Sequence, residues 1–140
     1  MLFLGHIAVS LILADATKSD RRAAIAGNLL PDVIDKTGGW VLRLMPSGRW
    51  LAHGLPFFGA TILLARRFLD GPRWRGFALG YLGHLIGDLY GGASVPWLAP
   101  FAAPRKAKRG KLISGADVWP EVRGALAILA LLGRRRPRGP

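Results

Sequence analysis

Apolar stretches of helical length alternate along the chain with short polar or Gly/Pro-rich connections. No segment shows the strict apolar–polar alternation that is typical of a half-buried strand. The apolar stretches cover residues 1–14, 21–30, 51–69, 74–90 and 119–133. The pattern therefore predicts an all-α fold, an up-and-down helical bundle of about four to five helices that forms a single domain over residues 1–133.

Particular residues indicate where these helices begin and end. Asp20 or Ser19 is positioned to cap the second helix, which is expected to stop near Pro31. Pro56 suits the first turn of the third helix, because its fixed φ is compatible with a helix start. A short amphipathic turn is expected around residues 40–45, inside an otherwise Gly- and Pro-punctuated segment.

Composition favours a membrane environment. Hydrophobic residues make up 51% of the chain and the mean hydropathy is +0.27, which is high for a soluble protein. The third and fourth stretches approach the length of about 20 residues that a spanning helix needs. The fourth also contains glycines at small-xxx-small spacing, which lets membrane helices pack closely. We therefore expect a membrane-embedded, multi-pass protein of the cytoplasmic (inner) membrane in contact with lipids, without a cleavable signal peptide.

The net charge of +12 indicates an anionic partner. A basic run occupies residues 105–111, and residues 134–140 form a basic C-terminal tail. Because no aromatic residue interrupts the run, it is better suited to a phosphate or lipid headgroup than to stacked bases. A solvated loop is the alternative, and the hydropathy argues against nucleic acid as the partner.

Histidine and aspartate recur inside these apolar stretches, where charge is expensive to bury. His84 and Asp88 are four residues apart, so a helix would place them on one side. In an up-and-down bundle with short loops, the helix order brings six such residues to one bundle end: His6, Asp32, Asp35, His53, His84 and Asp88. Histidine and carboxylate in an apolar setting are the usual ligands of a divalent metal such as zinc. The absence of cysteine excludes a thiolate site.

Each of these residues also has an ordinary structural interpretation. A single histidine on an apolar face is most often a hydrogen-bonded core residue, and this applies above all to His6. Asp32 after Pro31 would suit a turn or a helix start. Asp35 beside Lys36 would suit a solvated ion pair, which contributes little stability.

Four motifs follow His6 along the chain: GNLLPDVIDK at 27–36, SGRWLAHG at 47–54, GYLGHLIGD at 80–88 and VPWLAPF at 95–101. Together with His6 they resemble the YdjM-type family of predicted membrane-bound metal-dependent hydrolases. The resemblance covers residues 1–101 and implies an integral membrane protein with a metal centre. It also implies functional positions for His6, Asp32, Asp35, His53, His84 and Asp88.

The chain departs from the family pattern in two places. Family members commonly have Thr-His-Ser around the central histidine, whereas this chain has Ala52-His53-Gly54 and lacks the hydroxyl groups. Many members have an Asp-x-Asp-His run after the proline. Here the acids are three residues apart and Lys36 follows, which speaks against Asp35 as a direct ligand.

A looser similarity connects the chain to the zinc-dependent phospholipases C and related nucleases. It implies that one metal is held by Asp32, His53, His84 and Asp88. Asp88 would then bridge to a second ion near His6, and the reaction would be phosphoester hydrolysis by metal-activated water.

These observations lead to two hypotheses. The first is a membrane-bound metal-dependent hydrolase of a phosphoester or lipid-linked substrate, with zinc, or alternatively manganese, at the site. Its metal ligands would be Asp32, His53, His84, Asp88 and His6, and Asp35 would be catalytic, as a general base or as an orienting residue. The second is a non-catalytic membrane protein that binds a protein partner or anionic lipid through residues 105–111, with the His/Asp set as a structural metal site.

Overall fold

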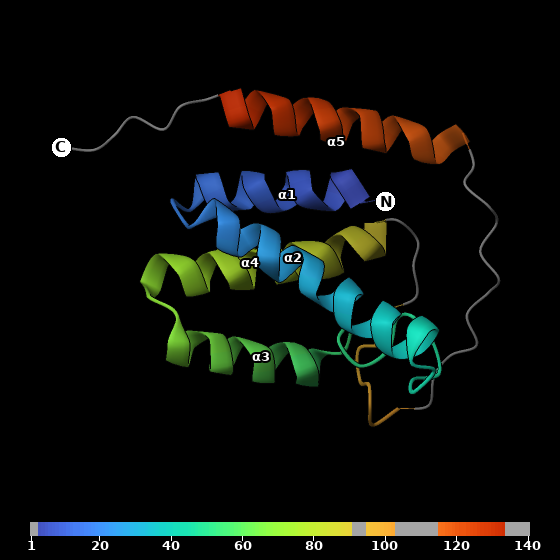
Figure 1. The fold of residues 1–140 in the computed structure, drawn as a ribbon. Coiled ribbons are helices and arrows are strands. Elements are labelled where there is room, and N and C mark those ends of the chain that lie inside the picture. Colours follow the sequence, from blue (N-terminus) through green and yellow to red (C-terminus); the bar gives the residue numbers. More distant parts are fainter. Residues whose placement is uncertain (1–2, 91–94, 103–114, 134–140) are drawn as a thin grey trace.

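The regular secondary structure of this computed structural model is entirely helical over the residues it describes, 3–90, 95–102 and 115–133 (Figure 1). The helices are α1 (Phe3–Ala16), α2 (Arg21–Lys36), α3 (Leu55–Phe68), α4 (Gly71–Tyr90) and α5 (Gly115–Gly133). A π-helical turn, η1 (Thr37–Val41), directly follows α2. The all-α prediction is thus confirmed for these residues. The basic run at 105–111 and the tail at 134–140 lie outside them.

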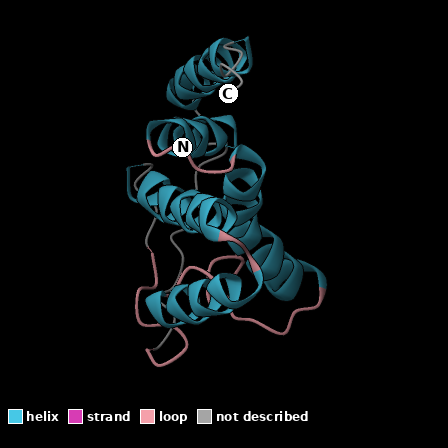
Figure 2. Ribbon diagram, turned by 90° about the vertical axis from the view of Figure 1, so that its left-hand side faces the viewer, coloured by secondary structure: helices cyan, strands magenta, loops and turns pink. Residues whose placement is uncertain are grey.

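Successive helices run in opposite directions, as expected for an up-and-down bundle (Figure 1). Helices α1, α2 and α4 pack on one another, α5 packs on α1, and α3 packs on α4 (Figure 2). A small apolar core of Tyr81, Leu85 and Val95 is surrounded by partly buried aromatic side chains, among them Phe57 and Phe77. This arrangement brings the start of α1 and the ends of α2 and α4 to the same end of the molecule.

Helix α2 does not stop near Pro31, which corrects the sequence-based expectation. It continues to Lys36 with Pro31 buried inside it. A proline inside a helix costs about 3 kcal/mol, because it lacks an N–H and its ring crowds the carbonyl one turn earlier. Packing of α2 against α4 outweighs this local cost. Consequently Asp32 and Asp35 lie on one helical turn instead of in a loop after the helix.

The segment between α2 and α3 also differs from the prediction. The expected amphipathic turn at 40–45 is not formed as such, since the chain first extends α2 through η1. Helix α3 begins at Leu55, with Pro56 in its first turn as expected. His53 therefore lies in the loop that precedes α3 and not on the helix.

Helices α2 and α4 approach so closely that their backbones are in contact. A Cβ atom added to Gly27 would collide with the carbonyl of Phe77, and one added to Gly80 would collide with the carbonyl of Ala24. At Gly83 the nearest atoms to such a Cβ are side-chain atoms at 3.4 Å, which is ordinary contact. The glycines of α4 thus differ in importance, and Gly80 lies at the tightest contact with α2.

Among the helices described here, none is long and apolar enough to cross a membrane, so the expected spanning helices are not found among them.

We expect Gly80→Ala to destabilise the fold far more than Gly83→Ala. The first adds a methyl group against a backbone carbonyl, which would force the two helices apart and cost about 3 kcal/mol, at the upper end of overpacking penalties. The second meets flexible side chains and gains helix propensity. Thermal denaturation of both variants is the test, and equal melting temperatures would contradict the assigned contact.

Candidate metal centre

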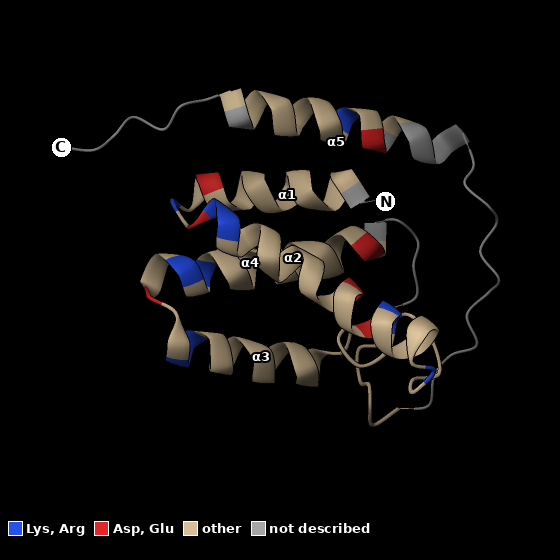
Figure 3. Cartoon of the chain, viewed as in Figure 1, with Lys and Arg blue, Asp and Glu red and all other residues tan. Residues whose placement is uncertain are grey.

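The six residues singled out from the sequence meet at one end of the bundle. His6 comes from the start of α1, Asp32 and Asp35 from the end of α2, and His53 from the loop before α3. His84 and Asp88 come from the last turns of α4, and acidic positions of α2 and α4 lie near this end in Figure 3. All are buried except Asp32, which is partly exposed.

Asp35 fixes the position and tautomer of His53. Its carboxylate contacts His53 Nδ1 at 2.7 Å and accepts hydrogen bonds from the backbone N–H groups of Trp50 at 2.6 Å and Ala52 at 2.9 Å. Burial alone would raise the pKa of Asp35, but these donors together lower it. With Nδ1–H directed at Asp35, the Nε2 atom of His53 is the one that faces the other site residues.

The loop that carries His53 is held from two further sides. The Tyr81 hydroxyl donates to the carbonyl of Ala52. The backbone N–H of Leu55 donates to the carbonyl of Trp97 at 2.8 Å, which ties the loop to the segment 95–102. These contacts position an imidazole that no helix carries.

His53 and His84 point their Nε2 atoms at each other, 3.2 Å apart. Asp88 Oδ2 lies 3.3 Å from His53 Nε2 and 3.9 Å from His84 Nε2. Asp32 Oδ1 lies 3.8 Å and 3.9 Å from the same two nitrogens. Two ligand atoms on a tetrahedral zinc ion lie about 3.4 Å apart, given zinc–nitrogen distances of about 2.0–2.1 Å. The spacings around the two histidines are therefore close to those of a ligand shell.

His6 lies on the other side of Asp88. Its Nε2 atom is 3.4 Å from Asp88 Oδ1, and its ring lies 4.7 Å from that of His84. The backbone at His6 is held by Asn28 and Ser10, which both donate to the His6 carbonyl, at 3.0 Å and 2.9 Å. Two overlapping groups could hold a cation, His6–His84–Asp88 and Asp32–His53–His84, with His84 common to both.

Two buried atoms at the centre, Asp32 Oδ1 and His84 Nδ1, have no hydrogen bond within the described part of the chain, and Asp88 Oδ2 is compensated there by its ion pair with Arg49. Leaving a buried polar group without a hydrogen bond costs about 1–3 kcal/mol, more for a charged one. A divalent cation next to the Asp32 oxygen would remove that cost. The donor set of the site thus fits a metal ion.

Burial and charge act differently on the three central side chains. Burial lowers the pKa of His84 to about 4, more than the charges of Asp88 and Asp32 offset, so its imidazole is neutral at pH 7 and able to ligate. Burial opposes the charge of Asp88, but contacts with His53, His6 and Arg49 hold its pKa well below the usual value. Burial likewise lowers the pKa of His53, yet its bonds to Asp35 and Asp88 leave it raised. A cation at this point would replace a proton on His53.

Sequence reasoning missed Arg49 and assigned Lys36 to the wrong partner. Arg49 forms an ion pair with Asp88, its Nε 3.0 Å from Oδ2, although it stands in a loop with no helical periodicity to reveal it. Lys36 pairs with Asp32 at 2.6 Å, not with its neighbour Asp35 as one interpretation suggested. The i,i+4 spacing of Asp32 and Lys36 was a usable signal, but only if α2 continues past Pro31.

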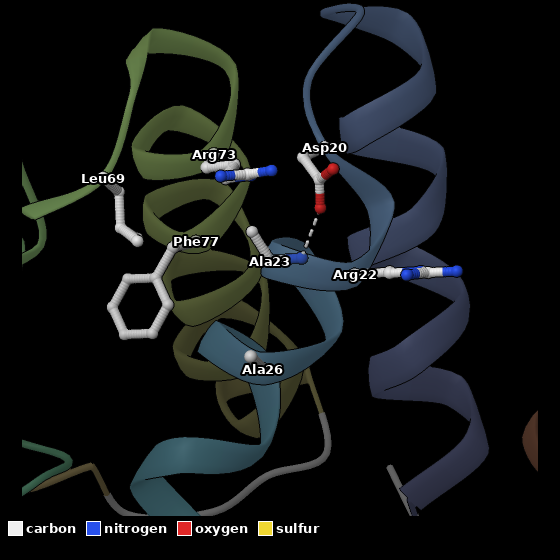
Figure 4. Close-up of a pocket in the computed structure, with 7 residues that line it drawn as sticks. All are labelled: Asp20, Arg22, Ala23, Ala26, Leu69, Arg73 and Phe77. Carbon is white, nitrogen blue, oxygen red and sulfur yellow. Dashed lines mark hydrogen bonds between the residues drawn. The ribbon is translucent and has the colours of Figure 1, made fainter.

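A separate cavity of about 460 Å³ opens at the opposite end of the bundle, where α2 and α4 begin (Figure 4). Asp20 there accepts from the backbone N–H of Ala23 and so caps α2, and the side chain of Arg22 points away from the hollow. Leu69, Arg73 and Phe77 complete much of its wall. The carboxylate in its lining, Asp20, is already used to cap α2 and has no histidine or second acid beside it in that lining, so the His/Asp cluster is the better candidate site.

The family model described as YdjM inner membrane protein matches residues 1–138 of the 140-residue chain. The comparisons with curated proteins and with solved structures found no match.

We expect His53→Ala, His84→Ala, Asp32→Ala and Asp88→Ala each to reduce bound zinc or manganese sharply, because each removes a ligand atom from the centre. His6→Ala should have a smaller effect, since His6 Nε2 lies 3.4 Å from Asp88 Oδ1, on the side of Asp88 away from His53. Elemental analysis of purified protein, with melting temperatures with and without chelator, provides the measurement. Asp70→Ala, at the opposite bundle end, is the control. Wild-type protein with neither bound metal nor a thermal response to added metal would reject the site.

We expect Asp35→Asn to lower the free energy of unfolding by about 3 kcal/mol, because an amide cannot accept all three N–H donors that surround this buried carboxylate. Metal affinity should also fall by about 10–100-fold, the usual result of losing a residue that orients a ligand. Denaturant titration and metal titration measure the two effects. Asp70→Asn, in an exposed cap where asparagine serves equally well, is the matched control. Wild-type stability in Asp35→Asn would contradict the assigned role.

Proposed function

The chain belongs to the YdjM inner membrane protein family, and on that premise we propose that it is a metal-dependent hydrolase at the inner membrane. Its substrate would be a phosphoester or a lipid-linked compound, and its metal zinc or manganese. The observation that carries this proposal is the meeting of His53, His84, Asp32 and Asp88 from three separate parts of the chain, where the buried Oδ1 atom of Asp32 has no hydrogen bond among the described residues.

Each site residue has a role in this proposal. Asp32, His53, His84 and Asp88 would hold the ion, and His6 would support Asp88 or bind a second ion on its far oxygen. Asp35 would orient His53 and keep its Nε2 available. A bound divalent ion would supply an activated water as nucleophile and polarise the phosphoryl oxygen. Neutral imidazole with carboxylate suits zinc, and manganese is compatible with the same donors.

Exposed apolar side chains support contact with a membrane. Exposed large apolar side chains are numerous on the described surface and are not limited to a few isolated positions. Large exposed apolar patches mark sites of contact with proteins or membranes. Near the site end the exposed apolar side chains include Trp40, Val41, Leu42, Leu44 and Phe101. These residues give the proposed site a surface that would meet lipid, without requiring a helix that spans the bilayer.

Positive charge near the site supports an anionic substrate. Lys36 and Arg49 lie beside Asp32 and Asp88 and are partly exposed, with side chains 41% and 44% accessible. The chain as a whole carries a net charge of +12. Partly exposed cations next to a buried metal-binding cluster would favour phosphate-containing substrates.

The second candidate function is a non-catalytic membrane protein with a structural metal site, which binds a protein partner or anionic lipid. The full burial of His53 favours this alternative, because a closed site restricts access to an ion. The partial exposure of Asp32 and Arg49 favours the enzyme, since solvent reaches these two side chains, which border the cluster.

We expect purified protein to hydrolyse at least one member of a panel of phosphomonoesters, phosphodiesters and phospholipids, with activity lost in chelator and restored by zinc or manganese. His84→Ala should be inactive, and Arg75→Gln on the exposed part of α4 should retain activity. Stoichiometric metal in a protein that remains inactive on the whole panel would support the structural alternative. Activity that is unaffected by chelator would contradict a metal-dependent mechanism.

A further inference from the structure

Arg49 reaches from the loop before α3 to the carboxylate of Asp88 on α4. Its Nε lies 3.0 Å from Oδ2 and its Nη2 donates to Oδ1 at 3.1 Å, so both oxygens are engaged by one guanidinium. The two partners differ greatly in exposure: the side chain of Asp88 is 2% accessible and that of Arg49 is 44% accessible. Arg49 thus joins a deeply buried carboxylate to the open side of the cluster.

The oxygens that Arg49 contacts are also those that face the histidines. Oδ2 lies 3.3 Å from His53 Nε2, and Oδ1 lies 3.4 Å from His6 Nε2. A cation placed between Asp88 and these nitrogens would therefore draw on the same carboxylate that Arg49 neutralises. Because the ion carries two positive charges, it would weaken the hold of Asp88 on the guanidinium.

Arginine has five N–H donors in a planar fork, a geometry that matches phosphate as well as carboxylate. Within the described part of the chain, Asp88 is the one acidic residue with which Arg49 pairs. A guanidinium released from Asp88 would consequently have donors to offer an anion arriving at the open side of the site.

We propose that Arg49 is the phosphate-binding residue of this site: it holds Asp88 until a divalent cation takes over that carboxylate, and then binds a phosphate group of the ligand. This inference rests on the metal-binding function proposed above. It gives Arg49 two roles: to compete with the cation for Asp88 in the metal-free protein, and to contact the phosphate in the metal-bound protein.

The proposal predicts opposite effects of Arg49→Gln on cation and anion. In this variant the cation no longer competes with a guanidinium for Asp88. Zinc or manganese should therefore bind about tenfold more tightly, which corresponds to the free energy of one charge-assisted contact. The metal-free variant should melt at a lower temperature than the wild type. Inorganic phosphate should bind the metal-loaded variant about tenfold more weakly, for the same reason.

Metal titration and phosphate titration by calorimetry, on the full chain, provide the test. Arg73→Gln is the matched control, because Arg73 also pairs with an aspartate, Asp70, but at an exposed position of the opposite bundle end. That variant should leave both affinities unchanged. A second anion arm uses phosphatidylcholine vesicles with and without phosphatidic acid. Weaker binding of Arg49→Gln only to the vesicles identifies a lipid headgroup as the phosphate source, and weaker binding only to inorganic phosphate identifies a soluble compound.

The outcomes separate this inference from the function on which it rests. Wild-type protein that binds metal would overturn the role of Arg49, and leave the metal site in place, if Arg49→Gln binds metal no more tightly, or if it binds both inorganic phosphate and the phosphatidic acid vesicles as tightly as the wild type does. Metal binding by Arg49→Gln but not by the wild type would support the competition. If neither protein binds zinc or manganese, the metal site and the role of Arg49 are both rejected.

Discussion

The cost of burying carboxylates is the constraint on which this structure depends. Asp35 and Asp88 have almost no exposed surface, and an isolated buried charge would cost more than a fold of this size can offset. Each is therefore compensated by groups from elsewhere in the chain. Asp35 takes its donors from the loop before α3, and Asp88 takes Arg49 from the same loop and histidines from α1 and that loop. These contacts connect α1, α2 and α4 to the loop before α3. The polar cluster therefore holds this end of the bundle together.

The cluster could not form without the close approach of α2 and α4. Helices that pack through ordinary side chains are about 8–10 Å apart. Gly27 and Gly80 remove the side chains at the crossing and bring backbone against backbone. Asp32 on the last turns of α2 then comes within 3.9 Å of His84 on α4, although the aspartate side chain is short. At Gly87, one turn beyond His84, an added Cβ would lie 2.7 Å from the His6 ring, so the glycine also makes room for α1 at the site. Small residues in an apolar helix here serve the placement of polar groups.

The helices and the bundle end could be predicted from sequence because both follow from short-range rules. Apolar periodicity located α1 to α5, and alternation of direction placed His6, Asp32, His53 and Asp88 at one end.

The prediction failed where tertiary contact outweighed a local preference. Pro31 was expected to end α2, but packing against α4 stabilises the helix as far as Lys36. Because the helix continues, Asp32 and Lys36 lie one turn apart and form an ion pair. Arg49 could not be found, because a loop has no periodicity that points a side chain at a partner 39 residues away.

The two ends of the bundle differ in a way that bears on the type of substrate. Lys and Arg residues gather where α1 meets α2 and where α3 meets α4, and others lie around the end of α2 near the cluster (Figure 3). The site end also carries strongly exposed apolar side chains, including Leu44 at 78% and Phe101 at 84%. A soluble phosphoester gains nothing from such a surface, which costs free energy in water. A lipid-linked substrate would cover it with its apolar part while its phosphate meets the polar cluster. Of the two substrate types proposed, the surroundings of the site therefore favour the lipid-linked one.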